Sequence, residues 1–349
     1  MSIASRCGVF VLSSLIFASS SALSLSAQQT EPKAEPGGKV ILDVVVSPRS
    51  GLPVASLQQQ DFQVLDNKAS QAMTSFAELG GEKAPVEVLL VIDAVNATFS
   101  TVAMERDQIK NFLRSHGEHL ANPTSLAIVT DTGMQIQPSP SKDGNALSTA
   151  LDQYTGGLRT LRRSSGFYGA DDRMNLSINA MHQLVAREGM KKGRKLILWV
   201  SPGWPLLSGP NVQLGAKQEQ QIFSTVVQLS TQLRQAQVTL YALDPLGANE
   251  SLLRNLYYEN FVKGLTKPRD AALGNLALQV LAVQSGGLAV NSNDLTALLE
   301  HSVEDVTAYY EISYDPPPAD RRDEYHSVEI RMTKPGLTAR TIQGYYSQP

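Results

Sequence analysis

Four short apolar runs separated by stretches of helical spacing constrain this chain most. The runs are Val86–Asp93, Ser125–Asp131, Arg194–Ser201 and Gln237–Asp244. Apolar runs without alternation are typical of strands buried on both faces of a sheet. Helical spacing occurs at residues 101–119, 142–155, 173–189, 216–235, 270–284 and 293–308. This alternation predicts an α/β domain at residues 84–305, Rossmann-like, with a parallel sheet and helices on both faces.

The chain on either side of this region has strand patterns without helices. Residues 39–80 contain the β-branched run Val40–Val46 and the alternating run Asp61–Asp66. Residues 309–347 contain three further strand patterns, at 309–314, 327–333 and 339–346. Each segment is too small to bury a core by itself. We therefore predict that 309–347 packs with 39–80 as one small β domain; two separate appendages are the alternative.

Residues 1–27 have the pattern of a secretory signal peptide. Arg6 supplies a positive charge, Val9–Phe17 is a short apolar run, and the small-residue tract Ala18–Ala27 follows. The run is shorter than a membrane span requires. We therefore expect cleavage, export to the periplasm or the medium, and a flexible linker at residues 28–38. An uncleaved N-terminal anchor is the alternative.

The single cysteine, Cys7, lies inside this predicted signal peptide. The exported chain would therefore have no cysteine, which excludes disulfides, thiolate-bound metals and a cysteine nucleophile. The net charge of -3 does not favour nucleic-acid binding. No second apolar stretch is long enough to cross a bilayer, so we expect no stable membrane insertion after cleavage.

Polar residues follow the apolar runs at the points where strands end. In open α/β sheets, ligands bind outside the carboxyl ends of the strands. Ser201 also stands at such an end. The residues that we expect to contact a partner are Asp93, Asn96, Asp131, Trp204 and Asp244.

The run Val88–Asp93 followed by a helix resembles the start of a von Willebrand factor A (VWFA) domain. The whole chain more closely resembles the bacterial VWFA-related domain proteins abundant in Acidobacteria. The segments that carry this resemblance are Leu42–Val46, Gly51–Val54, Asp61–Leu65, Ile92–Asn96, Ile109–Leu113, Gly193–Gly203, Tyr309–Tyr314, His326–Val328 and Gly344–Tyr346. They span nearly all of the chain after residue 38. The resemblance implies a VWFA fold.

The resemblance also implies a metal-ion-dependent adhesion site for Mg²⁺ or Mn²⁺, with an Asp-x-Ser-x-Ser motif, a later Thr and a later Asp. Asp93 matches the first Asp, but Val95 and Ala97 stand at the two Ser positions and Pro202 at the later Asp. No Thr stands in the expected place before residues 173–189. One carboxylate is too few to hold a hydrated Mg²⁺. We therefore expect a degenerate site in which Asp93 is the one ligand of the usual set that remains. The alternatives are a different site that Asn96, Asp131 or Ser201 would rebuild with Asp93, and a capping role for Asp93.

Other catalytic motifs are missing from the sequence. It has no phosphate-binding loop, no dinucleotide fingerprint and no Gly-x-Ser-x-Gly elbow. Ser201 resembles a nucleophile, but the sequence places no base beside it. Together with the resemblance, this predicts a non-enzymatic protein-interaction or adhesion module without a cofactor, whose partner is a protein. A hydrolase that uses Ser201 and a structural component of the cell envelope are the alternatives.

Overall fold

The computed structural model of the chain describes residues 38–81, 84, 86–155, 166–205, 213–247 and 257–347. The predicted signal peptide and the linker up to residue 37 lie outside the described residues. Every described residue belongs to one compact unit, Pro36–Pro349. Within the described ranges, no helix combines the length and the hydropathy that a membrane span requires.

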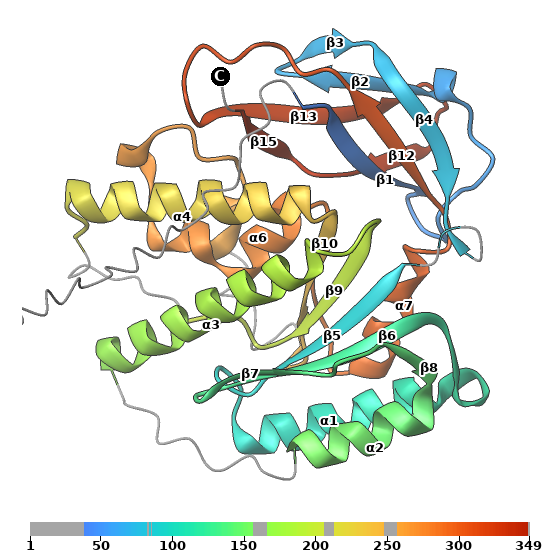
Figure 1. Ribbon diagram of the computed structural model, residues 1–349, viewed down its shortest axis with the longest axis vertical. Helices are drawn as coiled ribbons and strands as arrows, with labels where there is room; N and C mark the ends of the chain where they lie inside the picture. Colours follow the sequence, from blue (N-terminus) through green and yellow to red (C-terminus); the bar gives the residue numbers. More distant parts are fainter. Residues whose placement is uncertain are drawn as a thin grey trace, which may run out of the picture. The chain divides into compact units, whose positions relative to one another are not determined.

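A seven-stranded sheet lies at the centre of the α/β part (Figure 1). Its order is β11-β10-β9-β5-β6-β7, and β8 also pairs with β6. Its strands are β5 (Glu87–Asp93), β6 (His119–Thr130), β7 (Gly133–Ile136), β8 (Ser141–Asp143), β9 (Lys195–Val200), β10 (Val238–Asp244) and β11 (Ala289–Asn291). The strands from β11 to β6 are parallel, whereas β7 and β8 are antiparallel to β6. The predicted α/β class is confirmed, but the apolar runs did not indicate the antiparallel edge.

Helices cover both faces of this sheet (Figure 1). One face carries α1 (Phe99–Arg114), α2 (Gly144–Thr155) and α7 (Leu295–Glu304), and the other carries α3 (Gly166–Glu188), α4 (Ala216–Gln235) and α6 (Leu278–Gln284). Successive residues of β5 show why the strand has no polar face. Leu90 and Ile92 pack on the α1 side, whereas Leu89 and Val91 pack on the α3 side. Because both faces are covered, both need apolar side chains.

Short 3-10 helices occupy several connections. They are η1 (Gln59–Asp61), η3 (Ser115–Glu118), η4 (Glu259–Phe261), η5 (Pro268–Asp270) and η6 (Leu273–Leu276). The continuous helix predicted over residues 270–284 is therefore wrong in its first half. Ala272 and Ala277 both adopt extended backbone angles, which interrupt the helix before α6 begins.

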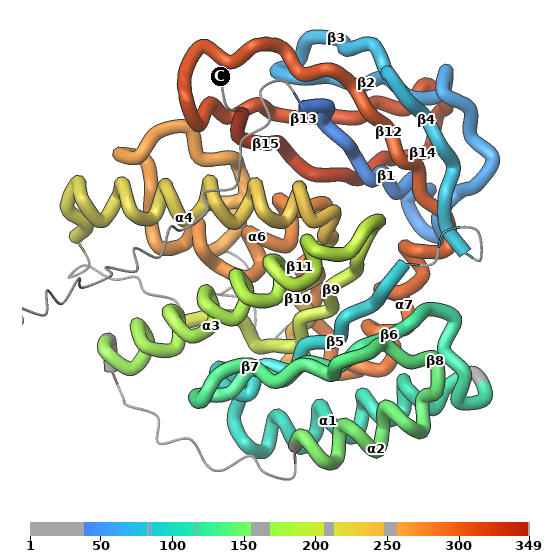
Figure 2. The backbone as a smooth tube through the Cα atoms, viewed as in Figure 1, coloured from blue at the N-terminus to red at the C-terminus, as the bar shows by residue number. Residues whose placement is uncertain are grey.

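The two terminal segments form a pair of four-stranded sheets (Figure 2). One has the order β14-β1-β12-β4 and the other β15-β13-β2-β3. Their strands are β1 (Val40–Pro48), β2 (Phe62–Asp66), β3 (Ala69–Gln71), β4 (Met73–Leu79), β12 (Tyr309–Tyr314), β13 (Glu324–Met332), β14 (Leu337–Arg340) and β15 (Gly344–Ser347). Each sheet thus combines two strands from residues 39–80 with two from residues 309–347. The strand pattern predicted at 339–346 divides between the sheets as β14 and β15.

One apolar cluster joins the two sheets into a sandwich. Leu42 pairs with Ile312 in the first sheet, Val64 pairs with Ile330 in the second, and all four belong to this cluster. The sandwich contacts the central sheet near the amino end of β9. There the guanidinium carbon of Arg194 lies 4.6 Å from the ring centre of Tyr309. The carboxyl ends of the parallel strands lie at the other edge of the sheet, which we call the carboxyl edge (Figure 1).

Candidate functional site

The carboxyl edge brings the predicted strand-end residues onto neighbouring strands. β5 lies between β6 and β9, and β9 lies between β5 and β10. Ile92 of β5 pairs with Val200 of β9, which also pairs with Leu243 of β10. The next residues along these strands are Asp93, Ser201 and Asp244. Asp93 and Ser201 are in direct contact, since the Ser201 hydroxyl donates to Asp93 Oδ2 at 2.9 Å.

Asp93 is fully buried and accepts hydrogen bonds at both carboxylate oxygens. Its Oδ1 accepts from the backbone N–H groups of Val95, at 3.1 Å, and Asn96, at 3.0 Å. Its Oδ2 accepts from Asn96 Nδ2 at 2.9 Å and from Trp199 Nε1 at 3.2 Å, in addition to Ser201. Burial raises the pKa of Asp93, and the hydrogen bonds oppose this shift. Asp93 therefore organises the interior of the edge.

The turn after β5 depends on these contacts. Asn96 Nδ2 also donates to Ser177 Oγ at 2.8 Å, which links the turn to α3. The N-cap of α1 is Thr98, whose hydroxyl accepts from Thr101 N at 3.1 Å. The side-chain oxygens of Asp93 therefore satisfy N–H groups of the turn and not those of the helix, because a residue five positions before the N-cap Thr98 cannot reach the free N–H groups of α1.

The donor set around Asp93 does not fit a Mg²⁺ site. Mg²⁺ takes oxygen ligands in near-octahedral geometry. Both Asp93 oxygens already accept N–H or O–H groups, and Val95 and Ala97 are buried apolar side chains. In the described parts of the chain, no three His, Cys, Asp or Glu residues gather as metal ligands would. A metal at Asp93 would have to displace several of its donors.

We expect millimolar Mg²⁺ or Mn²⁺ to leave the melting temperature unchanged within about 1 °C, because a ligand stabilises only the state that it binds. Differential scanning calorimetry with the ion and with EDTA measures this. A saturable rise that is lost in Asp93→Asn would contradict the expectation.

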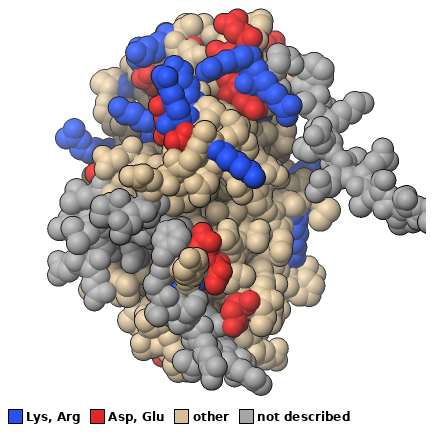
Figure 3. Space-filling model, turned by 90° about the vertical axis from the view of Figure 1, so that its left-hand side faces the viewer, with Lys and Arg blue, Asp and Glu red and all other residues tan. Residues whose placement is uncertain are grey.

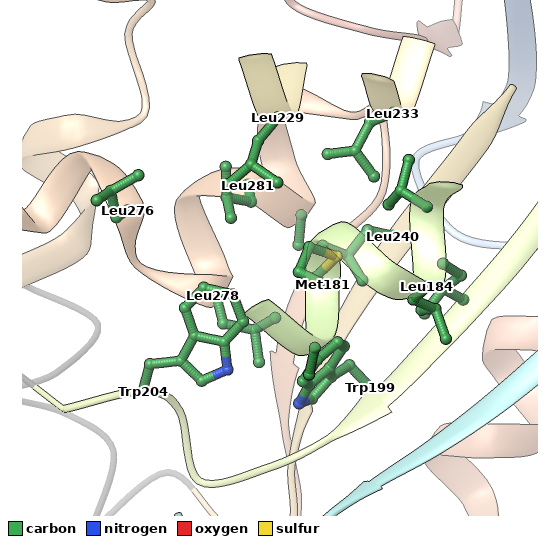
Figure 4. Packing of buried hydrophobic residues seen from close by; sticks show 14 of the residues in the cluster. Met181, Leu184, Trp199, Trp204, Leu229, Leu233, Leu240, Leu276, Leu278 and Leu281 are labelled. Atoms are coloured by element: carbon green, nitrogen blue, oxygen red, sulfur yellow. The ribbon is translucent and has the colours of Figure 1, made fainter. Parts of the chain in front are cut away.

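Trp204 does not offer its ring to a partner in this structure. It is only 2% exposed, and its ring centre lies 5.6 Å from that of Trp199 in an edge-to-face arrangement. Figure 4 shows both rings within the apolar cluster beside Met181 and Leu278. The expected contact role of Trp204 is therefore corrected to a packing role, because covering the strand end buries the ring.

The other predicted contact residues divide between interior and surface. Asp244 is buried, and its Oδ1 accepts from Leu246 N at 2.9 Å, so it too organises a turn. Asn96 is half-buried and Asp131 is exposed. The Asn96 amide oxygen is buried and its nitrogen donates to Asp93 and Ser177, so this side chain also acts inside the edge. Of the predicted contact residues, Asp131 lies where a partner can reach it.

The geometry at Ser201 does not resemble an activated nucleophile. The side chain is buried, and its hydroxyl proton points to Asp93. Its Oγ also accepts from Gly203 N at 3.1 Å. Among the described residues, no imidazole hydrogen-bonds to Ser201, although a histidine is the usual base for a serine nucleophile.

Glu105 is a residue of this edge that the sequence reasoning missed. It lies on the buried face of α1 with Val102 and Ile109, and neither carboxyl oxygen has a hydrogen-bond partner. Burial, followed by the nearby charges of Asp93 and Asp244, raises the pKa of Glu105 well above its usual range. The sequence signal was an acidic residue within the apolar stripe of a predicted helix.

Two exposed aromatic side chains flank the carboxyl edge. Phe99, the first residue of α1, is 64% exposed, and Tyr168, in the first turn of α3, is 83% exposed. These helices cover opposite faces of the sheet, and both begin at this edge (Figure 1). Figure 3 shows this side of the molecule, where most visible Lys and Arg side chains gather in the upper half.

No protein-family model matches this chain, and no curated protein matches it in sequence. Among solved structures, the pilus adhesin SpaC from Lactobacillus rhamnosus GG matches 82% of this chain and 48% of its own, with 10% identity and a TM-score of 0.37. Proximal thread matrix protein 1 from the mussel byssus matches 65% of this chain and 49% of its own, with 14% identity and a TM-score of 0.32. This chain thus spans about half the length of each. At these TM-scores neither likeness assigns a family or a function.

Proposed function

We propose that this chain is an exported, non-enzymatic protein-interaction module of the VWFA-related family. It binds a partner protein through the loops and helix starts at the carboxyl edge, without a metal ion. The observation that carries this proposal is which side chains of the carboxyl edge are buried and which are exposed. Asp93, Ser201 and Asp244 are buried and hydrogen-bonded internally. Phe99, Tyr168 and Asp131, which are suited to recognition, are exposed.

The exposed groups fit the anatomy of a protein interface. Phe99 and Tyr168 are large side chains whose apolar area is favourable to bury, and aromatic residues often anchor such contacts. Asp131, in the turn after β6, adds an exposed carboxylate that can set the orientation of a partner. The export part of the proposal is supported by the signal pattern of residues 1–27.

A pull-down with a matched control tests the proposal. The full chain, tagged and cross-linked in a cell-envelope extract, should enrich one partner that mass spectrometry identifies. We expect the double variant Phe99→Ser, Asp131→Lys to recover about 10-fold less, since loss of an aromatic anchor costs more than about 1 kcal/mol. The control is Met190→Ser, since Met190 is also highly exposed, at 81%, but follows α3 close to the start of β9.

Two outcomes would contradict the proposal. One is equal recovery by the edge variant and the wild type, which would place the interface elsewhere. The other is turnover of ester, amide or glycoside substrates that Ser201→Ala abolishes, which would support the hydrolase alternative instead.

A further inference from the structure

Four polar side chains from four strands meet inside the β sandwich, far in sequence from one another. They are Asp66 of β2, Tyr314 of β12, His326 of β13 and Tyr345 of β15. Each is at most 3% exposed. Tyr314 comes from one sheet and the other three come from the facing sheet. None of them belongs to the carboxyl edge, and the proposed function does not use them.

The polar atoms of these side chains converge on the Asp66 carboxylate. Its Oδ2 accepts from the Tyr345 hydroxyl at 2.6 Å and from the Tyr314 hydroxyl at 2.9 Å. Its Oδ1 lies 2.8 Å from His326 Nδ1, which is 3.3 Å from the Tyr345 hydroxyl. Ligands about 2.0–2.2 Å from a metal ion are separated from each other by about 2.8–3.6 Å in octahedral and tetrahedral complexes. The cluster therefore already holds its donor atoms near the spacing of a metal's ligands.

We propose that this cluster binds a trivalent metal ion of the Fe³⁺ class through the Asp66 carboxylate, the Tyr314 and Tyr345 phenolates and the His326 imidazole. The ligand chemistry favours this class of ion. The carboxylate and the two phenolates are anionic oxygen ligands whose three negative charges a trivalent ion neutralises, and phenolate oxygen is an established iron ligand. The guanidinium of Arg234, beside Tyr345, adds one positive charge outside the ligand set.

Every proton of the cluster is accounted for when the ion binds. Tyr314 and Tyr345 each release a hydroxyl proton to solvent when their oxygens bind the ion. The His326 proton moves from Nδ1 to Nε2, so that the Nδ1 lone pair can face the ion. In the present structure Nε2 is buried without a hydrogen-bond partner, so this move breaks no bond at that atom. Two protons therefore leave for each ion bound.

The surroundings of Tyr314 and Tyr345 affect the protonation of these side chains in both the metal-free and the metal-bound site. Burial raises the pKa of both Tyr314 and Tyr345, so the phenols stay protonated in the metal-free form at neutral pH. The guanidinium carbon of Arg234 lies 5.7 Å from the ring centre of Tyr345, and its charge favours the phenolate. Because two protons compete with the ion, its apparent affinity should rise by about 100-fold for each pH unit.

Binding of iron during refolding tests the proposal. Since the side chains are buried, the full chain is refolded from denaturant with ferric citrate, and unbound iron is removed by gel filtration. We expect about one iron per chain and a visible phenolate-to-iron charge-transfer band. Tyr345→Phe and Tyr314→Phe each remove one ligand oxygen and should retain less than about a tenth of the iron, because ligand loss weakens binding strongly.

The matched control is Tyr346→Phe, at the next residue of β15. Tyr346 is also buried, but its hydroxyl donates to the Leu265 carbonyl at 3.0 Å and lies outside the cluster. This variant should keep both the iron and the band. It separates loss of a ligand from the general cost of removing a buried hydroxyl.

Three results would overturn the proposal. The first is natively refolded wild type without iron or the band, which would leave the cluster as a polar network joining two sheets. The second is full iron loading in both Tyr345→Phe and Tyr314→Phe. The third is one Zn²⁺ per chain with Fe³⁺ excluded, which would refute the trivalent assignment. The wild-type band decides the matter even if the variants do not fold.

Discussion

Replacing Asp93 with alanine should lower the free energy of unfolding by about 3–5 kcal/mol at neutral pH, because removing a buried charged acceptor leaves its donors unpaired. The donors are the backbone N–H groups of Val95 and Asn96 and the side chains of Asn96, Trp199 and Ser201. They come from the turn after β5, from β9 and from the residue after β9. Urea unfolding followed by far-UV circular dichroism measures the change.

The matched control for this experiment is Asp131→Ala. Asp131 also follows a strand of the central sheet, but its side chain is exposed. Its replacement should change the free energy of unfolding by less than about 0.5 kcal/mol. A loss below about 1 kcal/mol in Asp93→Ala, or equal losses in the two variants, would show that the donors of Asp93 find other partners.

Replacing Glu105 with methionine should instead stabilise the protein, by about 1–4 kcal/mol at pH 7.5, as replacing a buried ionisable group that lacks hydrogen-bond partners with an apolar one often does. Glu105 has no hydrogen-bond partner at either oxygen, and Val102 and Ile109 share its face of α1. A methionine side chain has similar volume and can adapt to an apolar site. The same urea titration measures the gain.

The gain should depend on pH in a defined direction. The pKa of Glu105 in the folded protein lies well above its ordinary value of 4.5. Above pH 4.5 the unfolded chain therefore loses this proton more readily than the folded chain, so the wild type loses stability as the pH rises towards the folded pKa. The advantage of Glu105→Met should be largest above that pKa and smallest near pH 4. An advantage that is equal at both pH values would rule out ionisation as the cause.

The sequence predicted the central sheet well, because a strand that is buried on both faces needs a continuous run of apolar residues, which is visible in the sequence. The runs that became β5, β9 and β10 are apolar at nearly every position, and the intervening helices show their own period. The sequence predicted fewer elements correctly where the residue pattern is short or absent. β7, β8 and β3 are only three or four residues long, and the helical spacing at 270–284 did not reveal the two extended residues that interrupt it.

The candidate site was predictable in position but not in the roles of its residues. Asp93, Ser201 and Asp244 were expected at one edge, because carboxyl ends of parallel strands lie together. Nothing in the sequence distinguished the buried Asp93 from the exposed Asp131, since each follows an apolar run. Trp204 is buried because it packs on Trp199, a contact that depends on how the chain turns after β9.

By itself the sequence determined the alternation of strands and helices, the strand-end position of the polar residues and the absence of cysteine after Cys7. Each of these is a local or compositional property. The tertiary structure alone decided which polar groups meet. His326 contacts Asp66 across 260 positions of the chain, and Glu105 lies near Asp93 and Asp244 without a hydrogen bond. Such contacts depend on the pairing of distant strands and the packing of helices, which local periodicity does not encode.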